Sequence, residues 1–287
     1  GVTAGAADSS LNAPPQPRVL VNGEQTSQVD VADRGFSLGD GLFETIAVRG
    51  GAPRFWDAHC QRLLEGCGRL GLPVPDTDRL RRELQHARAG VAHGTARLSV
   101  TRGPGPRGYA PPADPQPTRV VAFQPAVAGN EPAATAFVLR WCATRLALQP
   151  ALAGIKHLNR LEQILARAEW TDPAVHEGIM QATDGRVVEC VMSNLFLVRD
   201  DRLITPVLDA CGVRGVMRGQ VLLAAESLGI PVEVRRVEPA EVAAAHGALV
   251  TNCVRGAVPV ERIGERAYDA GHPVLQQLRA RLEALDG

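Results

Sequence analysis

The stretch Gly154-Ile155-Lys156-His157-Leu158-Asn159-Arg160-Leu161-Glu162-Gln163 contains the only lysine of the chain. Lysine and arginine together number 31, so arginine occupies the other 30 positions. Either cation serves on a solvated surface, but only lysine can lose its proton in a protein and become a nucleophile or a base. A single lysine among so many arginines therefore indicates a position that needs a free amine, for a Schiff base or for general-base catalysis. The alternative is chance retention at a surface position.

Composition argues against several function classes. The chain has 287 residues, of which 45% are hydrophobic, and its formal net charge is zero. This length allows one large domain or two of ordinary size. Without a basic excess or a polybasic run, we expect neither nucleic acid nor a membrane surface as a partner. No apolar run is long enough to span a bilayer.

The N-terminus and the cysteines indicate where the protein works. Residues 1–17 are small, polar and proline-bearing, so we expect a flexible tail, without the basic start and apolar centre of a signal peptide. No cysteines form a CxxC pair or have zinc-ligand spacing, so we expect no metal site. Free thiols in a chain of this length are typical of the reducing cytosol, which predicts a cytoplasmic protein. The six cysteines are Cys60, Cys67, Cys142, Cys190, Cys211 and Cys253.

Residues 18–124 predict a small N-terminal domain of strands and helices. An Asn22-Gly23 turn separates the first two strands. Asp57 is expected to cap a helix that ends near Leu70, and Asp76 a helix that ends near Ala89. Residues 125–136 have the composition of a linker. The predicted strands are Arg18–Val21, Val29–Val31, Leu42–Val48, Ala96–Thr101 and Arg119–Phe123.

Residues 137–287 predict a larger C-terminal domain with much antiparallel sheet. Thr183-Asp184-Gly185 and Asp200-Asp201 are turn signals that predict two hairpins. Helices are expected from about Asn159 to Trp170, from Gly215 to about Leu228, and from about Val274 onward. The predicted strands are Phe137–Cys142, Ile179–Gln181, Arg186–Glu189, Leu195–Val198, Arg202–Ile204, Val232–Arg235 and Ala248–Thr251. The fold class is therefore mixed α/β, of the α+β kind.

Four short motifs could carry chemistry, and each has a structural alternative. The loop Arg102–Tyr109 offers two cations and a phenol on glycine and proline residues, but it could be an ordinary surface loop. His59 and Arg62 share one face of a predicted helix, where such residues are more often structural than anion-binding. The segment Gly212–Met217 precedes a helix whose first amides could bind a phosphate. Glu189 ends an apolar strand, either paired with a cation or at the sheet rim.

The order and spacing of these motifs resemble those of the fold-type IV pyridoxal phosphate enzymes, the class IV aminotransferase family. The resemblance runs from about Val19 to Val260 and implies a two-domain fold with a barrel-like sheet in the larger domain. The matching motifs are Asp33-Arg34-Gly35, Gly39-Asp40-Gly41, His59-x-x-Arg62-Leu63, Lys156, Glu189, Ser193-Asn194-Leu195-Phe196 and Gly215-Val216-Met217-Arg218.

The resemblance implies the cofactor and its ligands. Lys156 would hold pyridoxal 5'-phosphate covalently and later act as the base, while Glu189 would keep the pyridine nitrogen protonated. Arg62 and the amides of Val216 and Met217 would bind the cofactor phosphate. The remaining cofactor-binding residues implied by the resemblance are Ser193, Asn194, Asn252 and Cys253.

The resemblance also implies the substrate side. Arg107 and Tyr109 would meet substrate carboxylates, reaching in from the second subunit of a homodimer whose active site lies near the subunit contact. Thr45 would help to move a proton. Arg255-Gly256 stands where the similar lyases carry an apolar Met-Pro pair, and the added cation of Arg255 suits a dianionic substrate or a transaminase substrate.

Within the family, the segment around Lys156 and the loop Arg102–Tyr109 are most similar to those of the 4-amino-4-deoxychorismate lyases. That likeness implies a carbon–oxygen lyase of folate biosynthesis, which converts 4-amino-4-deoxychorismate to 4-aminobenzoate and pyruvate. A D-amino-acid or branched-chain aminotransferase is the alternative, because one site can serve both reactions. A cofactor-binding protein without activity is a third hypothesis, which the presence of Lys156, Glu189 and Arg62 disfavours.

Overall fold

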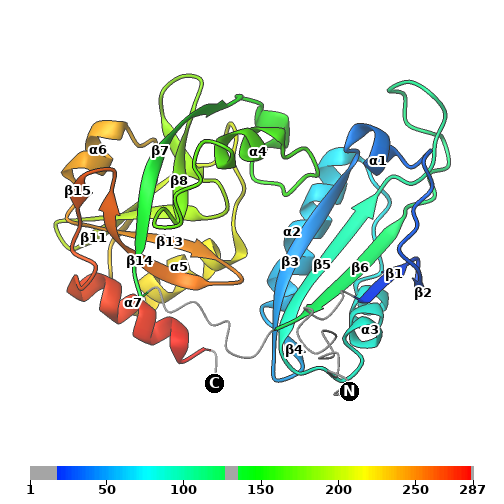
Figure 1. The fold of residues 1–287 in the computed structure, drawn as a ribbon, viewed down its shortest axis with the longest axis horizontal. Helices are drawn as coiled ribbons and strands as arrows, with labels where there is room; N and C mark the ends of the chain where they lie inside the picture. The colour runs from blue at the N-terminus through cyan, green and yellow to red at the C-terminus, as the bar shows by residue number, and fades with distance from the viewer. Residues whose placement is uncertain (1–17, 127–134, 286–287) are drawn as a thin grey trace, which may run out of the picture.

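A computed structural model describes residues 18–126 and 135–285, whose strands form two sheets that lie side by side (Figure 1). The predicted tail, 1–17, and most of the predicted linker, 125–136, fall outside the described residues, so the division into two domains stays a prediction. The mixed α+β class is confirmed, because both sheets carry helices and most strand pairs are antiparallel. In the described part of the chain, no helix is both long and apolar enough to cross a membrane.

The first sheet is antiparallel throughout and has the strand order β2-β1-β6-β5-β3-β4. Along β5, every second residue faces α2 and α3, so Ala96, Leu98 and Val100 are buried in one core with Leu63 and Leu80. The strands are β1 (Arg18–Val21), β2 (Glu24–Gln25), β3 (Gly41–Arg49), β4 (Ala52–Pro53), β5 (Gly94–Thr101) and β6 (Arg119–Pro125). The helices are α1 (Arg34–Leu38), α2 (Trp56–Leu70) and α3 (Thr77–Arg88).

Two expectations for this half are wrong and one helix was missed. Val29–Val31 is not a strand: after the Asn22-Gly23 turn, β1 pairs with Glu24–Gln25, and Val31 is left 80% exposed with no sheet to cover it. Helix α2 begins at Trp56, and Asp57 lies in its first turn instead of capping it. The missed helix α1 is short, and the Asp33 side chain caps it by accepting from the amide of Gly35 at 2.8 Å.

The second sheet has the order β12-β11-β10-β13-β14-β7-β8-β9, with β15 paired to β14. Both predicted hairpins form, since Met180 pairs with Glu189 and Val198 with Leu203. Three pairs are parallel: β11 with β12, β14 with β7, and β7 with β8. The strands are β7 (Phe137–Leu146), β8 (Glu177–Ala182), β9 (Val187–Cys190), β10 (Asn194–Arg199), β11 (Arg202–Pro206), β12 (Val232–Arg235), β13 (Gly247–Asn252), β14 (Gly256–Ile263) and β15 (Arg266–Ala267).

The second sheet curls and buries separate cores on its two faces. Leu195, Leu197 and Val250 belong to one core, whereas Phe196 and Leu249 belong to the core beneath α5 and α7. Strand β14 was not predicted, although it lies in the middle of the strand order. The helices are α4 (Leu161–Arg167), α5 (Val216–Ser227), α6 (Pro239–Ala244) and α7 (Pro273–Glu283), with a 3₁₀ turn, η2, at Pro150–Leu152.

Helix α4 is shorter than the predicted span Asn159–Trp170. Its start is displaced because the amide of Leu158 donates to the carbonyl oxygen of Gly41 at 3.0 Å, which holds the chain extended beside β3. At its other end, the Glu169 carboxylate accepts from two backbone amides of β7, those of Ala143 and Thr144. Hydrogen bonds to β3 and β7 therefore accompany the loss of two residues at the start of the expected helix and three at its end.

Candidate active site

The segment that carries Lys156 is held between the two halves of the molecule. On one side, the amide of Phe43 in β3 donates to the carbonyl oxygen of Lys156 at 3.0 Å. On the other side, Gly154 donates to the carbonyl oxygen of Gly212 at 2.8 Å and accepts from the amide of Arg214 at 3.0 Å. Gly154 has a φ of 85°, and a Cβ there would lie 2.7 Å from Nε of Arg214. The segment thus needs glycine at position 154, two residues before the lysine.

The amine of Lys156 has the properties of a nucleophile. Burial, reinforced by the charge of Arg62, lowers the pKa of Lys156 to about 8, although Glu44 acts in the opposite direction. Nζ stands 4.3 Å from the centre of the Phe43 ring. No hydrogen bond or ion pair within the described residues occupies the amine. A substantial share of the protein therefore carries a neutral, available amine just above neutral pH.

Glu189 is a buried carboxyl group at the end of β9, with only 5% of its surface exposed. Its Oε2 accepts from the amide of Val213 at 2.9 Å and from Nδ2 of Asn194 at 3.3 Å. Burial raises the pKa of Glu189 to about 7, against the effects of the Val213 amide and of Arg160 and Lys156. Asn194 also accepts from the amide of Gly215 at 3.0 Å, and so couples this carboxyl group to the start of α5.

Arg62 points into the molecule and is held by Glu44. Its Nε donates to Oε1 of Glu44 at 2.8 Å and its Nη2 donates to Oε2, while Nη1 donates to the carbonyl oxygen of Arg214 at 3.0 Å. Nδ1 of His59 lies 2.6 Å from Oε2 of the same carboxylate. Glu44 and His59 are each 1% exposed. A guanidinium has five N–H donors, so two remain for a ligand.

Phe43 and Thr45 lie on the face of β3 opposite to the core residues Leu42 and Ile46. Thr45 follows Phe43 by two residues, so their side chains share one face of the strand. Thr45 is half-buried and pairs in register with Arg97 of β5. The guanidinium of Arg97 stands 4.0 Å from the Phe43 ring centre. Arg97 was missed by sequence reasoning, although its place in the alternating pattern of β5 is readable.

The loop after β5 is anchored through its backbone and through Arg102, which is buried and donates to Asp40, whereas Arg107 and Tyr109 face solvent. Arg34 donates from Nη1 to the carbonyl oxygen of Gly108 and from Nη2 to that of Tyr109, both at 3.0 Å, and from Nε to Asp40 at 2.9 Å. Tyr109 is 86% exposed, and Arg107 is exposed too. In the described part of the chain, neither side chain makes a hydrogen bond or ion pair.

A model of the amino-transferase class IV family matches residues 41–263. The chain belongs to the class IV aminotransferase family. It is 33% identical over 263 residues to an aminodeoxychorismate lyase of Vibrio harveyi, covering 88% of this chain and 94% of that protein. It is 29% identical over 232 residues to a D-alanine aminotransferase of Listeria monocytogenes, covering 75% and 77%. A solved 4-amino-4-deoxychorismate lyase of Pseudomonas aeruginosa matches with a TM-score of 0.87 and 46% identity, covering 93% of this chain and 98% of that one.

Class IV aminotransferases use pyridoxal 5'-phosphate, and the residues of this site fit that cofactor. Lys156 offers an amine for its aldehyde, and Glu189 offers a carboxyl group for its pyridine nitrogen. The amide of Val216 lies in the first turn of α5 and has no acceptor within the helix. Nε2 of His59 and Oγ1 of Thr251 are also buried without a hydrogen-bond partner in the described chain. Such orphaned groups suit a phosphate with several acceptor oxygens.

Several residues that the family resemblance assigned to the cofactor are engaged with the protein. Oγ of Ser193 donates to Oε2 of Glu177 at 3.0 Å and accepts from Nδ2 of Asn252 at 3.2 Å. Glu177, missed by sequence reasoning, is 1% exposed, and burial raises its pKa to about 7. Ser193 and Asn252 therefore brace the segment that leads to Asn194. Their contact with the cofactor, like that of Met217 and Cys253, stays a prediction.

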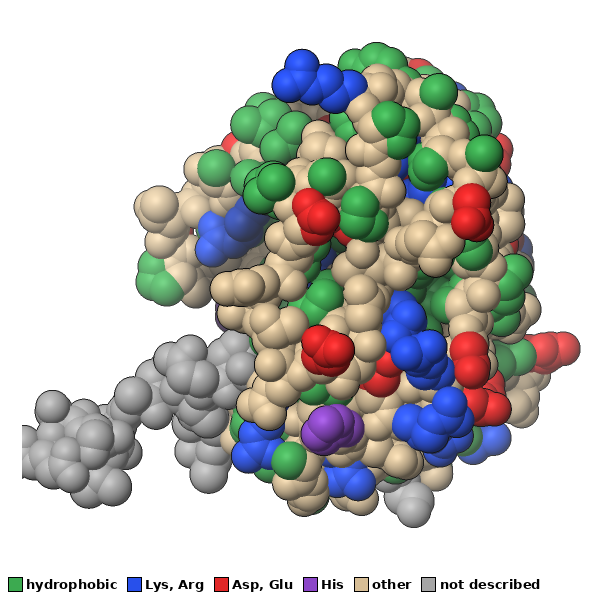
Figure 2. All heavy atoms as spheres, turned by 90° about the vertical axis from the view of Figure 1, so that its right-hand side faces the viewer, with side chains coloured by type: hydrophobic (Ala, Val, Ile, Leu, Met, Phe, Trp, Pro, Cys, Tyr) green, Lys and Arg blue, Asp and Glu red, His purple; other side chains and the backbone are tan. Residues whose placement is uncertain are grey.

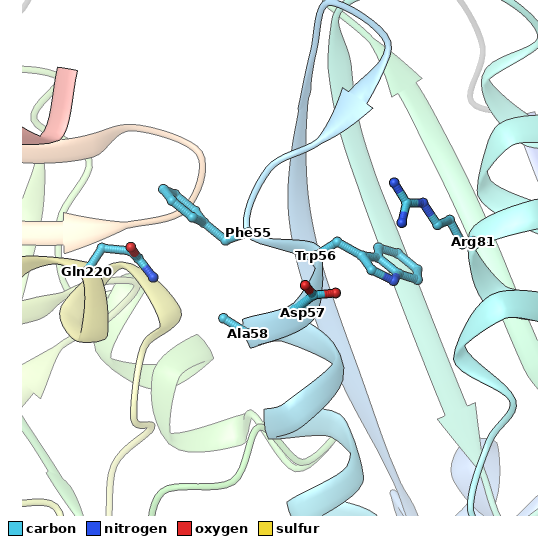
Figure 3. Close-up of a pocket in the computed structure, with 6 residues that line it drawn as sticks. All are labelled: Phe55, Trp56, Asp57, Ala58, Arg81 and Gln220. Atoms are coloured by element: carbon cyan, nitrogen blue, oxygen red, sulfur yellow. The ribbon is translucent and has the colours of Figure 1, made fainter. Parts of the chain in front are cut away.

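Two cavities flank the cofactor residues of this class IV chain. Arg255 stands 5.7 Å from the Phe137 ring centre and lines a cavity of about 250 Å³ together with Arg49 and Met217. A larger cavity, of about 430 Å³, lies where α2 begins (Figure 3). Figure 3 shows Phe55 and Gln220 on one side of it and Trp56 beneath Arg81 on the other. This second cavity contains none of the predicted site residues.

Proposed function

We propose that this chain is an aminodeoxychorismate lyase, which converts 4-amino-4-deoxychorismate to 4-aminobenzoate and pyruvate. The observation that carries the proposal is the 46% identity, over 93% of this chain, to the solved lyase of Pseudomonas aeruginosa. A D-alanine aminotransferase reaches 29% identity over 75% of the chain. The reaction belongs to folate biosynthesis, and the free state of all six cysteines supports a cytoplasmic location.

The site residues have separate roles in this reaction. Bound pyridoxal phosphate supplies an electron sink for the pair released when a C–H bond next to the substrate nitrogen breaks. Lys156, with its lowered pKa, removes the proton from that carbon as a general base. Glu189 holds a proton at the pyridine nitrogen. In this proposal Thr45 passes the proton onward, and its position on the face of β3 that carries Phe43 supports that role.

Elimination needs no further reactant. When the electron pair of the broken C–H bond returns to the substrate ring, the bond between the ring carbon and the enolpyruvyl oxygen breaks. The leaving group then takes up a proton to become pyruvate. The six-membered ring becomes aromatic, which drives the step. The atoms of the substrate equal those of 4-aminobenzoate plus pyruvate, so neither water nor a keto acid is consumed.

The substrate carries two carboxylates, and arginines are the side chains that bind carboxylates with a fork of two hydrogen bonds. Arg97 is placed for this role by its position over the Phe43 ring. We infer that Arg107 and Tyr109 act on a second copy, and their exposure on an anchored loop supports this inference. Arg255, beside the Phe137 ring, would supply a further cation at the entrance to the active site.

A homodimer is supported by exposed apolar side chains near the same loop. Phe36 in α1 is 75% exposed, and in α4 Leu161 and Leu165 are 73% and 62% exposed. In Figure 2, hydrophobic side chains gather at the upper end, the end at which α1 lies in Figure 1. Apolar groups in such number are typical of a contact between subunits. We propose that this end packs against a second copy and brings the loop of each chain to the other's site.

The lyase assignment is tested with purified protein loaded with pyridoxal phosphate. Incubation with 4-amino-4-deoxychorismate alone should release equal amounts of 4-aminobenzoate and pyruvate. The matched control is Lys156→Ala, which should release neither. Absence of 4-aminobenzoate from the intact, loaded protein would overturn the assignment.

The alternative is an aminotransferase, favoured by the 29% identity to the D-alanine aminotransferase of Listeria monocytogenes. A transaminase needs an amino donor and a keto acid together. Mixing the loaded protein with D-alanine and 2-oxoglutarate, or with a branched-chain amino acid in place of D-alanine, distinguishes the two. New glutamate from these mixtures, with no 4-aminobenzoate from the first assay, would establish the aminotransferase.

A further inference from the structure

The charge on Arg62 is already balanced before a cofactor binds. Its guanidinium forms a two-bond fork with the Glu44 carboxylate, and both groups are buried. A phosphate monoester carries a charge of about −1.5 to −2 at neutral pH. The start of α5 contributes only about half a positive charge. A phosphate at this place therefore needs another cation.

We propose that His59 is that cation: its imidazolium, fixed through Nδ1 to Glu44, completes the phosphate subsite, and the bound phosphate lets His59 keep its proton to higher pH. This inference deepens the proposed function, because it rests on pyridoxal phosphate as the cofactor. His59 acts on the phosphate end alone and takes no part in the proton transfer at the substrate carbon.

The geometry around the imidazole carries the inference. Nδ1 lies 2.6 Å from Oε2 of Glu44, a separation typical of a charge-assisted hydrogen bond. The ring is 1% exposed, and its Nε2 has no hydrogen-bond partner among the described residues. A buried ring nitrogen without a partner is costly, so a ligand that supplies an acceptor there is favoured.

The surroundings of His59 affect its protonation in opposite directions, and the net effect favours the imidazolium. Burial opposes protonation, but the Cys253 thiol and the Glu44 carboxylate together prevail and raise the pKa of His59. Cys253 lies close enough to the imidazole for this effect. The other charged groups nearby are Arg62 on the same helix and Lys156, whose pKa is lowered by Arg62 and raised by Glu44.

The alternative is a neutral imidazole that only braces the Glu44 carboxylate. The two models differ in their proton balance. A neutral brace takes up no proton when phosphate binds. A cationic His59 makes affinity for phosphate fall by up to about tenfold per pH unit above the pKa of His59 in the cofactor-free protein.

The test compares pyridoxal phosphate with pyridoxal, which lacks the phosphate but reacts with the same lysine. Dissociation constants of both ligands are measured on cofactor-free protein from pH 7 to 9 by absorbance. Over this range free phosphate esters are already dianions, because their second pKa is about 6. Titration of Lys156 affects both ligands equally and cancels in their ratio. The preference of the wild type for pyridoxal phosphate should fall steadily as the pH rises.

Two variants and one direct measurement complete the design. His59→Asn keeps an amide N–H near Nδ1, and His59→Gln keeps one near Nε2, but neither can become charged. Both should bind pyridoxal as the wild type does, and both should show a preference for pyridoxal phosphate that is lower at pH 7 and independent of pH. At the alkaline end of this pH range, where free His59 loses its proton, wild-type protein should also take up more protons from weak buffer with pyridoxal phosphate than with pyridoxal.

Either of two results would overturn the proposal: equal proton uptake with the two ligands, or an unchanged pH slope in a folded variant at residue 59. The uptake measurement uses the wild type, so it decides even if both variants fail to fold. None of these readouts involves turnover. A protein that shows the expected pH dependence and yet makes no 4-aminobenzoate would overturn the lyase assignment alone.

Discussion

Phe43 and Lys156 hold each other in place across the two sheets. The amide of Phe43 donates to the carbonyl oxygen of Lys156 at 3.0 Å, and the Phe43 ring lies 4.3 Å from Nζ. Phe43 belongs to β3 of the first sheet, whereas the lysine segment is also bonded to the Gly212–Arg214 loop of the second half. The reactive amine is therefore positioned by both halves, and the following predictions depend on that arrangement.

The reaction of Lys156 with aldehydes should follow its lowered pKa. A lysine is neutral above its pKa, so the yield of covalent capture of pyridoxal should rise as the pH passes about 8, well below the ordinary lysine value. Borohydride reduction and peptide mapping should find the label on Lys156 alone. Lys156→Arg keeps the charge as a matched control and should remain unlabelled. A visible cofactor band in the Lys156→Ala protein would contradict this reading.

Glu189→Gln should bind pyridoxal phosphate but lose most turnover, because a neutral amide cannot keep the ring nitrogen protonated. We expect a loss in kcat of about 100-fold or more, as for removal of one preorganised electrostatic group. Steady-state kinetics measures the loss, and the absorbance of the bound cofactor checks occupancy. Glu189→Asp, which retains a carboxyl group, is the control. Near-normal kcat in the Gln variant would give Glu189 another role.

Glu44→Gln should destabilise the fold, because it leaves the buried cations of Arg62 and His59 without their carboxylate. Breaking a buried pair costs about 3–5 kcal/mol in the free energy of unfolding. The pKa of Glu44 is lowered: burial opposes this, but Arg62 and His59 prevail. The ionised Glu44 carboxylate therefore stabilises the folded protein at pH values above its ordinary pKa near 4.5. This stabilisation is lost as the pH falls through the lower pKa of the folded state. The deficit in denaturant unfolding should thus be full at pH 7 and shrink in acid.

Arg34→Met should loosen the loop that carries Arg107 and Tyr109. The variant loses the bonds to Asp40 and to the carbonyl oxygens of Gly108 and Tyr109. We expect KM for the substrate to rise about tenfold, since one charge-assisted contact is worth about 1.5–3 kcal/mol when fully lost. Amide hydrogen exchange at residues 108–110 should accelerate. Arg34→Lys, which keeps the charge but not the fork of donors, should give KM and exchange values between those of the wild type and the Met variant. Unchanged exchange in the Met variant would show that Arg34 does not anchor the loop.

Mixing Arg107→Ala protein with Lys156→Ala protein should regenerate activity if the loop serves the second copy. In such a heterodimer, one site receives both defects and the other receives neither. Each parent alone should be nearly inactive, because truncating one partner of a buried charge pair costs about 2–5 kcal/mol. Differently tagged chains confirm that subunits exchange. Exchanged but inactive mixtures would show that the loop serves its own chain, and a monomer at assay concentration would exclude the model.

Local sequence signals predicted the elements whose partners are adjacent in the chain. The two hairpins of the second sheet and the helix after Gly215 formed where turn and capping residues placed them. Val29–Val31 failed because an alternating pattern indicates a strand only when a neighbouring edge can accept it. Helix α4 begins two residues later than predicted, at Leu161, because residue 158 bonds to β3. Those outcomes depended on contacts distant in sequence.

The sequence by itself determined the chemistry: a single lysine can provide the amine, and its surrounding motifs place the chain in one family. Only the tertiary structure decided the protonation states of the site residues. Burial lowers the pKa of Lys156 and raises that of Glu189, and both effects come from atoms far along the chain. The same holds for Glu44, which no motif distinguished, and for His59, whose motif did not indicate its protonation state. Coulomb energy and desolvation depend on distance in space, and folding alone sets those distances.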